Sequence, residues 1–278
     1  MRTDLAEIAA ATVKGLPRLR ALNMVSNGLS TDKVVSDATQ MLEICSANRI
    51  GFSISISAHG VGKVVDDVYG VNGASERVAS TLKELRLLSE HVPFNLVLNC
   101  VLTSVNLHGV YDFLKWSQDE GFSTSFFLGE VRERFMNKDM EEVVRISKKD
   151  QPFLVSFLRY LSRRRGLLNH SAFRYDRLAD MVEKNSVRNL SCHYAMGGVI
   201  LGSDGSLYYC PHSRAIGNCK TEPAYAIYYD ESNLQYRKSA ILGQECAHCL
   251  PNEFSRMELE KDLLKYLRFV FIGRNDIR

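Results

Sequence analysis

The stretch Ile50-Gly-Phe-Ser-Ile-Ser-Ile-Ser57 decides the fold, because its apolar and polar side chains alternate with a period of two. That period predicts a β-strand. Before it, apolar residues recur at helical spacing from Val34 to Cys45, with Ser30 or Thr31 as the expected cap. After it, a loop from His59 to Gly73 leads into a second helical pattern, which has Val78, Leu82, Leu85 and Leu88 on one face.

The same alternation of strand and helix continues on both sides of this stretch. Apolar runs at Ala21 to Ser26, Phe94 to Leu102 and Phe122 to Leu128 predict three further strands. Asn106 is expected to cap a helix that Gly121 ends. Four strands separated by helices predict parallel βαβ units and therefore an α/β fold.

The beginning of the chain departs from this pattern, because the first element is a helix from Thr3 to Lys14, with Thr3 as a possible cap. A crossover helix requires a strand before it. We therefore expect that the first strand of the sheet is missing or that another chain supplies it. The sequence predicts a truncated domain on this ground alone.

The remainder of the chain changes character. Residues 138 to 187 are predicted to be helical, with breaks near Pro152 and Gly166, and the run Arg163-Arg164-Arg165 is interpreted as a solvated helix end. Residues 192 to 250 are rich in Gly, Tyr and Cys and are expected to contain little helix. A final helix is predicted from about Glu253 to Phe269.

Composition excludes several classes of function. The chain has 278 residues, 45% hydrophobic and 24% charged, and a net charge of +3. This charge is too small to favour nucleic acid or a membrane surface as a partner. The longest uncharged run, Val92 to Tyr111, contains Pro, Asn and His, which a bilayer disfavours. The N-terminus does not resemble a signal peptide, so a cytoplasmic location is expected.

Seven cysteines are present, and five of them follow residue 190. Asp204-Gly205 between alternating apolar residues predicts a hairpin that brings Cys192 and Cys210 together. Cys246-Ala-His-Cys249 supplies a second pair at C-x2-C spacing. Four thiolates suit either tetrahedral zinc or an iron–sulfur cluster.

The other cysteines and the nearby histidines have less specific interpretations. Cys45 and Cys100 lie at apolar positions of a predicted helix and strand, which is typical of small buried side chains. Cys219 could be a fifth ligand, a neighbour of a cluster or a free thiol. His193, His212 and His248 adjoin cysteines, and they could bind zinc or donate hydrogen bonds near a cluster.

Several of these segments together resemble radical S-adenosylmethionine enzymes with a SPASM or Twitch auxiliary domain. The resemblance extends over nearly the whole chain. Cys192 is followed after twelve residues by Gly205 and after four more by Cys210, as in the Cys–Gly–Cys signature of that domain. The segments that resemble the barrel of the family are Asn23-Met-Val-Ser-Asn-Gly28, Ser55-Ile-Ser-Ala-His-Gly60, Asp67-Val-Tyr-Gly-Val-Asn-Gly73 and Val101-Leu-Thr-Ser-Val-Asn106.

The resemblance implies a partial (β/α)6 TIM barrel, followed by a small Cys-rich domain. It implies a barrel over residues 1–137, a helical connector over 138–190 and the auxiliary domain over 191–278. Members of the family cleave S-adenosylmethionine to a 5′-deoxyadenosyl radical with a cluster bound by Cys-x3-Cys-x2-Cys. This sequence lacks that motif and the Gly-Gly-Glu-Pro motif. Met1-Arg-Thr-Asp-Leu resembles the segment that follows this Pro, so the resemblance predicts an incomplete barrel.

The resemblance also assigns site residues. Ser57 and Tyr69 match positions that contact S-adenosylmethionine, although Tyr69 stands where the family often has an Arg that meets the carboxylate of this ligand. Cys192, Cys210, Cys246 and Cys249 match the four ligands of a single auxiliary 4Fe-4S cluster, as in the Twitch form. The expected substrate, a peptide, protein or small molecule, is not identified by the sequence.

Two alternative functions stay open at this point. One is a non-catalytic iron–sulfur binding or electron-transfer protein, and the other is a zinc-binding α/β protein. Lacking the first cluster motif, the chain alone is not expected to start the radical reaction.

Overall fold

The computed structural model describes residues 3–132, 137–164, 169–250 and 256–271. The chain forms two compact units. One comprises Met1–Gly129 with Glu142–Arg145, and the other comprises Glu130–Glu141 with Ile146–Arg278. Of the predicted connector, residues 142–145 belong to the first unit, and the remainder belongs to the same unit as the Cys-rich segment.

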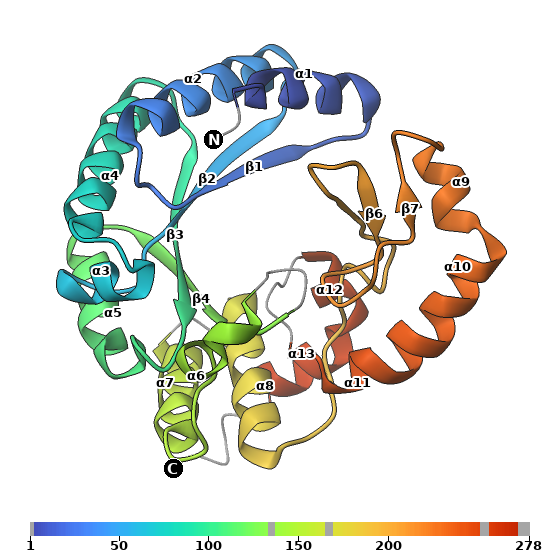
Figure 1. Cartoon of the computed structure of the whole chain (residues 1–278). Helices are drawn as coiled ribbons and strands as arrows, with labels where there is room; N and C mark the ends of the chain where they lie inside the picture. The colour runs from blue at the N-terminus through green and yellow to red at the C-terminus, as the bar shows by residue number, and fades with distance from the viewer. Residues whose placement is uncertain (1–2, 133–136, 165–168, 251–255, 272–278) are drawn as a thin grey trace. The chain divides into compact units, whose positions relative to one another are not determined.

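The first unit contains a four-stranded parallel sheet in the order β1-β2-β3-β4 (Figure 1). The strands are β1 (Ala21–Ser26), β2 (Gly51–Ser57), β3 (Asn95–Leu102) and β4 (Ser123–Leu128). They agree with the four predicted strands to within one residue at each end, and the α/β prediction is confirmed. The parallel order follows from the helix that separates each strand from the next.

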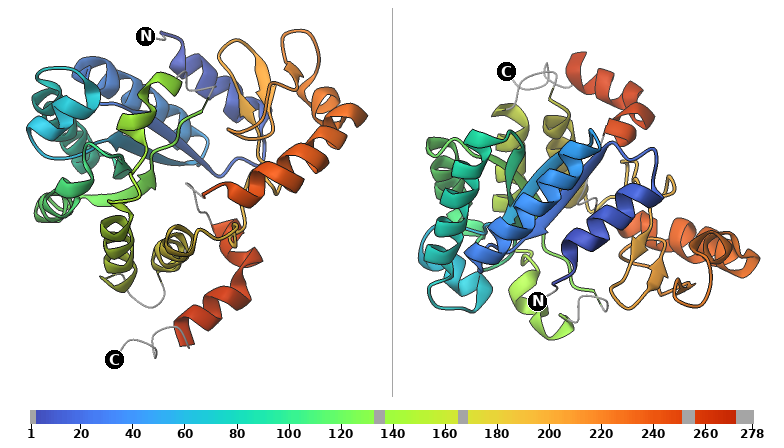
Figure 2. Two further views of the ribbon diagram at one scale, coloured as in Figure 1. Left: turned by 60° about the horizontal axis from the view of Figure 1, so that its bottom comes forward. Right: turned by 90° about the horizontal axis from the view of Figure 1, so that it is seen from above.

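Helices cover one face of this sheet, as Figure 1 and Figure 2 show. Helix α2 packs on β1 and β2, α4 packs on β3, and α5 packs on β4. The side chains of the sheet on this face are apolar and buried, for example Ile54, Leu98 and Phe126. The helices of the unit are α1 (Leu5–Gly15), α2 (Thr31–Ala47), α3 (Lys63–Tyr69), α4 (Ala74–His91), η1 (Leu107–Gly109) and α5 (Val110–Asp119).

Two local expectations in this unit were wrong. Helix α3 lies within the segment that was predicted to be a loop. Its length of seven residues gives too short an apolar pattern to be distinguished from a loop. Asn106 does not cap the following helix with its side chain. Its amide instead binds backbone atoms at the ends of the strands.

The second unit contains a pair of packed helices, α7 (Gln151–Arg164) and α8 (His170–Lys184). Arg159 of α7 forms ion pairs with Asp176 and Asp180 of α8, at 2.6 and 2.7 Å. On α8, Phe173 also packs against Tyr266 and Phe269 of α13 (Leu263–Phe271). The shorter helices of this unit are η3 (Lys138–Met140) and α12 (Arg256–Lys261), whereas α6 (Glu141–Val144) belongs mostly to the first unit.

The predicted final helix is thus present as α12 and α13, and its first residues lie outside the described part of the chain. The break predicted near Gly166 also lies outside it.

The predicted hairpin is confirmed. Strands β5 (Ile200–Leu201) and β6 (Ser206–Tyr208) pair antiparallel, and β7 (Gly217–Asn218) adds a third strand. The expectation of little helix up to residue 250 was wrong. The structure has α9 (Ala224–Tyr229), α10 (Glu231–Tyr236), the π-helical segment η4 (Arg237–Glu245) and α11 (Cys246–His248). Few apolar side chains of this region are buried, so its sequence carries a weak helical pattern.

No helix in the described ranges combines the length and the apolar character needed to cross a bilayer.

Candidate functional site

Ser57 and Tyr69, predicted to contact the same ligand, lie next to each other at the carboxyl end of the sheet. The hydroxyl of Tyr69 donates to the backbone carbonyl of Ser57 at 2.8 Å and to that of Asn27 at 3.2 Å. Ser57 ends β2, and Asn27 directly follows β1. The Tyr69 side chain therefore bridges the ends of two neighbouring strands.

The environment of Tyr69 keeps its phenol neutral. Burial raises its pKa to about 12, because the phenolate would be poorly solvated there. The single hydroxyl proton is already donated to backbone carbonyls. Tyr69 thus supplies neither the positive charge nor the spare donors that an Arg at this position would offer to a carboxylate.

Two further residues hold the strand ends together. His59, which follows β2, accepts a hydrogen bond at Nδ1 from the Val101 amide of β3, at 3.1 Å. The Asn106 side chain donates to the carbonyls of His59 and Val101, both at 2.8 Å. The His59 ring packs against that of Tyr69, with 5.3 Å between centroids. Burial lowers the pKa of His59 to about 4, so its imidazole is neutral.

The four predicted cysteine ligands all belong to the second unit, and their thiols are free. Cys192 interacts electrostatically with Cys210, Cys246 and Cys249, and Cys210 interacts with Cys246. Burial raises the pKa of Cys210, Cys246 and Cys249, the last to about 11. Each of the four thiols therefore affects the pKa of another thiol of the set, or has its own pKa affected by one.

A backbone hydrogen bond joins the two halves of this cysteine group. The Arg188 amide donates to the carbonyl of Ala247, between Cys246 and Cys249, at 2.9 Å. The Arg188 side chain donates to the carbonyls of Leu190 and Ser191, at 2.7 and 2.9 Å, just before Cys192. Arg188 therefore links the segment before the first cysteine to the turn that carries the last two.

Positive charges and backbone amides favour the thiolate forms. Arg188 lowers the pKa of Cys246 and Cys249, and Arg132 lowers that of Cys210 and Cys249, although burial outweighs both effects. Backbone amides of His212 and Ser213 donate to the Cys210 sulfur and lower its pKa as well. Amides and cations of this kind stabilise thiolates that bind a metal or a cluster.

The three histidines near the cysteines differ in their surroundings. Burial lowers the pKa of His212 to about 4, and its Nε2 atom has no hydrogen-bond partner among the described residues. His193 packs its ring on that of Tyr194, with 3.9 Å between centroids. The side chain of His248 lies outside what the structure describes.

The other three cysteines are accounted for by packing. Cys45 and Cys100 are fully buried in the first unit, on α2 and β3. Cys219 packs against the apolar cluster of the hairpin, formed by Leu207, Tyr209, Ile216 and Ile227.

The described residues contain no group of three or more His, Cys, Asp or Glu side chains that could hold a metal ion. A single zinc ion requires its four sulfurs to lie about 4 Å apart, since each Zn–S bond is about 2.3 Å long. In a four-iron cluster each thiolate binds a different iron, and the sulfurs lie roughly 6 to 7 Å apart. Four thiols are a donor set that suits either site.

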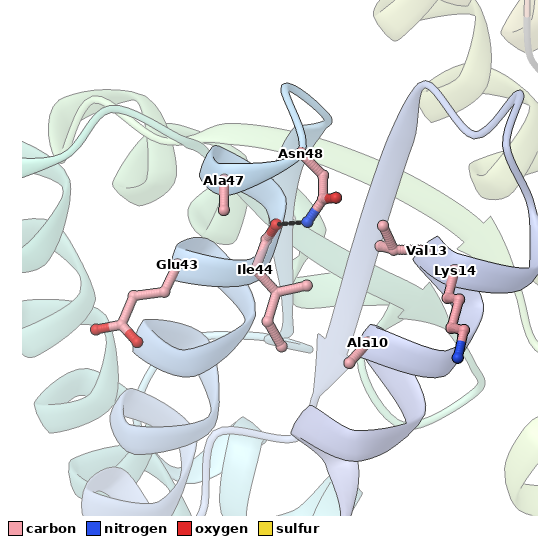
Figure 3. A pocket seen from close by; sticks show the side chains of 7 residues that line it. All are labelled: Ala10, Val13, Lys14, Glu43, Ile44, Ala47 and Asn48. Carbon is pink, nitrogen blue, oxygen red and sulfur yellow. Dashed lines mark hydrogen bonds between the residues drawn. The ribbon is translucent and has the colours of Figure 1, made fainter.

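A depression of about 500 Å³ lies elsewhere in the first unit, between α1 and α2 (Figure 3). Its walls are mostly apolar, and Asn48 in it donates to the carbonyl of Ile44. It adjoins the end of α2 that leads into the start of β2, and so it lies away from Ser57 and Tyr69. The lining residues are Ala10, Val13, Lys14, Glu43, Ile44, Ala47 and Asn48.

Comparison with known proteins finds no matching family model and no matching curated protein. Solved structures do match. A histidine-tagged form of anSMEcpe with bound AdoMet is 15% identical, with a TM-score of 0.51, over 92% of this chain and 72% of that chain. Native anSMEcpe with bound AdoMet and a Cp18Cys peptide is 14% identical, with a TM-score of 0.52, over 97% of this chain and 91% of that chain. The native protein with AdoMet alone is 13% identical, again with a TM-score of 0.52. At this identity the likeness establishes a shared fold, and this chain is similar to these structures over nearly its whole length.

Proposed function

We propose that this chain is a radical S-adenosylmethionine family protein that binds one auxiliary four-iron cluster through Cys192, Cys210, Cys246 and Cys249. The parallel sheet would be part of a (β/α)6 barrel, and the cysteines would belong to a Twitch-like domain. Two independent features support this proposal. The fold is similar to that of structures described with bound AdoMet, and the Arg188–Ala247 hydrogen bond joins the segment before Cys192 to the turn that carries Cys246 and Cys249.

The Arg188–Ala247 hydrogen bond is the observation that carries the proposal. Cys192 and Cys249 lie 57 positions apart in the sequence (249 − 192), and this hydrogen bond brings their segments together. A cluster with four cysteine ligands supplies electron transfer or structural support, because it leaves no iron open to substrate. Arg188, Arg132 and the His212 and Ser213 amides would stabilise its negative charge.

The carboxyl end of the sheet has few groups that could hold S-adenosylmethionine. Ser57 and Tyr69 would contact it weakly, because the Tyr69 hydroxyl is engaged with the carbonyls of Ser57 and Asn27. The Cys-x3-Cys-x2-Cys motif is absent from the sequence. The chain alone is therefore proposed not to start a radical reaction. A homologue that carries this motif would do so on a substrate that is still to be identified.

A zinc-binding α/β protein is the less favoured alternative. The four thiols are also a donor set that suits zinc, so metal analysis decides between zinc and iron. A non-catalytic iron–sulfur protein would have the same cysteine site and differ in lacking a substrate.

The test is anaerobic purification followed by absorption and metal analysis. A cluster gives a brown protein with a band at about 400 nm, whereas zinc is colourless. Replacing any of the four cysteines by Ala should lower the iron and sulfide content. Cys45→Ala and Cys219→Ala are the matched controls and should keep full iron. A colourless protein that contains zinc, or iron that is lost with Cys219 but kept without Cys246, would overturn the ligand set.

A further inference from the structure

Cys192 begins a turn that other parts of the second unit hold in place. Within the turn, the Met196 amide donates to the carbonyl of Cys192 at 3.2 Å, and the Gly198 amide donates to that of His193 at 2.9 Å. Fixing each backbone residue costs conformational entropy, so a few local hydrogen bonds are a weak constraint on the geometry of the turn. Contacts from elsewhere in the unit therefore matter for where the Cys192 sulfur lies.

The backbone before Cys192 is held by a buried carboxylate. Asp262, between α12 and α13, is 3% exposed, and its Oδ2 atom accepts a hydrogen bond from the Ser191 amide at 2.7 Å. Its Oδ1 atom pairs with Lys265 at 2.8 Å, and the same ammonium donates to the carbonyl of Asn189 at 2.8 Å. A buried carboxylate is costly unless it is paired and hydrogen-bonded, so this arrangement favours one position of the Ser191 amide.

The backbone after Cys192 is held by Arg237, the first residue of η4. Its Nη2 atom donates to the carbonyls of Tyr194 and Ala195, at 3.1 and 3.0 Å. Both residues lie in the same turn as Cys192. One nitrogen can donate to two carbonyls because each terminal nitrogen of a guanidinium carries two hydrogens in a fixed plane.

Arg237 also contacts the hairpin segment that carries Cys210. Its guanidinium lies over the ring of Tyr209, at 5.3 Å from the centroid, and over that of Tyr228, at 5.5 Å. Tyr209 directly precedes Cys210, is 1% exposed, and donates from its hydroxyl to the Tyr228 carbonyl at 2.7 Å. Cation–π attraction to two rings that are fixed in this way holds the guanidinium in place. A single side chain thus joins the Cys192 turn to the Cys210 segment.

We propose that Arg237 and Asp262 are positioning residues, which fix the backbone on both sides of Cys192 and so align its thiol with the other cysteine ligands before a cluster binds. Neither side chain is itself a ligand. Ligands that are already in place bind without the entropy cost of ordering them at that moment. This inference deepens the proposed function, on which it rests for the identity of the ligand set.

Alkylation of the full chain by iodoacetamide, followed by peptide mass spectrometry, tests the proposal. Wild type and variants are purified anaerobically and stripped of iron with a chelator, and circular dichroism checks their fold. Arg237→Gln and Asp262→Ala should each raise the alkylation rate of Cys192 about tenfold, because losing a hydrogen bond to a charged group makes the turn easier to open. The rate at Cys219, in the same unit, should stay unchanged, whereas a general loss of structure would raise it too.

Two further variants separate positioning from other effects. Arg214→Gln is the matched control, because the Arg214 guanidinium also lies over a tyrosine ring, that of Tyr236, at 4.6 Å. It should leave the alkylation rate of Cys192 unchanged. Asp262→Asn keeps an oxygen that can accept from the Ser191 amide, so it should recover most of the wild-type rate. An Asn variant that behaves like Asp262→Ala would show that this hydrogen bond does not position Cys192.

The rate of iron release from the iron-loaded chain to the chelator is the second measurement, and it decides the matter if iron removal unfolds the protein. It should rise about tenfold in Arg237→Gln and Asp262→Ala and stay unchanged in Arg214→Gln. Wild-type rates in both variants would overturn the proposal, as would a parallel rise in alkylation at Cys219. A wild-type chain that takes up no iron would overturn the proposed function instead, and alkylation would still test the positioning of Cys192.

Discussion

At the scale of single residues, the carboxyl end of the sheet is held by side chains bound to backbone atoms. Asn106 satisfies two carbonyls and accepts a hydrogen bond from the Thr103 amide, at 2.8 Å. His59 accepts from Val101, and Tyr69 donates to Ser57 and Asn27. Buried backbone groups left without partners cost about 1–3 kcal/mol each, so these side chains stabilise the loops that surround the candidate ligand site.

His59 makes the stability of the first unit depend on pH. Its pKa is lowered from 6.5 to about 4 in the folded protein. Between these values the unfolded chain binds more protons than the folded one, so the free energy of unfolding falls as the pH falls from 6.5 to 4. The loss from this group amounts to about 3 kcal/mol. His59→Asn, which keeps an acceptor for the Val101 amide, should remove most of this pH dependence.

Urea unfolding followed by the fluorescence of the single tryptophan measures this effect. Trp116 lies in α5, between Phe113 and Phe122, and therefore reports on the first unit. Both proteins contain His212, whose pKa is also lowered to about 4. Subtracting the pH dependence of the variant's free energy of unfolding from that of the wild type therefore leaves the contribution of His59 alone. Equal pH dependence in the two proteins would show that His59 does not remain neutral in the folded state.

At the scale of elements, the hairpin that leads to Cys210 depends on its turn. Gly205 has a φ of 88°, and a Cβ at this position would lie 2.7 Å from Asn218 Oδ1. Gly205→Ala should therefore destabilise the hairpin by about 1–3 kcal/mol and lower the iron content after anaerobic reconstitution. Gly109→Ala is the control, because Gly109 has open space around it. Full iron retention in the Gly205 variant would mean that the turn does not position Cys210.

The β1 strand lies at the edge of the described sheet. The Gly51 amide donates to the Arg20 carbonyl at 2.9 Å. In a parallel ladder this places the backbone groups of Ala21, Asn23 and Val25 on the open side. Val25 is also 62% exposed. Such an edge favours pairing with another chain.

We therefore expect self-association that increases with concentration in sedimentation velocity, and Val25→Lys should reduce it. Ile8→Lys on α1, a second exposed apolar residue, is the control and should have little effect. A wild-type monomer at all concentrations would contradict this expectation.

At the scale of the whole molecule, binding of S-adenosylmethionine tests how far the shared fold extends to a shared ligand. The sheet resembles that of structures with bound AdoMet, yet Tyr69 is neutral and its hydroxyl is engaged. Calorimetric titration of the chain with S-adenosylmethionine should show no dissociation constant of about 1 μM or below, which would correspond to about −8 kcal/mol. Binding of that strength would show that the contacts of Ser57 and Tyr69 suffice without the first cluster motif.

The sequence by itself determined the local elements. The four strands, their parallel order and the Asp204-Gly205 hairpin were predictable, because the period of apolar residues and the turn residues act over a few positions. The assignment of Cys45 and Cys100 to the core followed from the same periodicity.

Only the tertiary structure decided which partners the polar side chains take. Asn106 binds carbonyls of His59 and Val101 rather than capping its helix, and Tyr69 binds the ends of two strands. The Arg188–Ala247 bond that draws the cysteine segments together likewise joins positions far apart in the sequence. The physical reason is that a side chain satisfies whichever buried backbone group lies within hydrogen-bond reach, and packing of the whole unit determines which group that is.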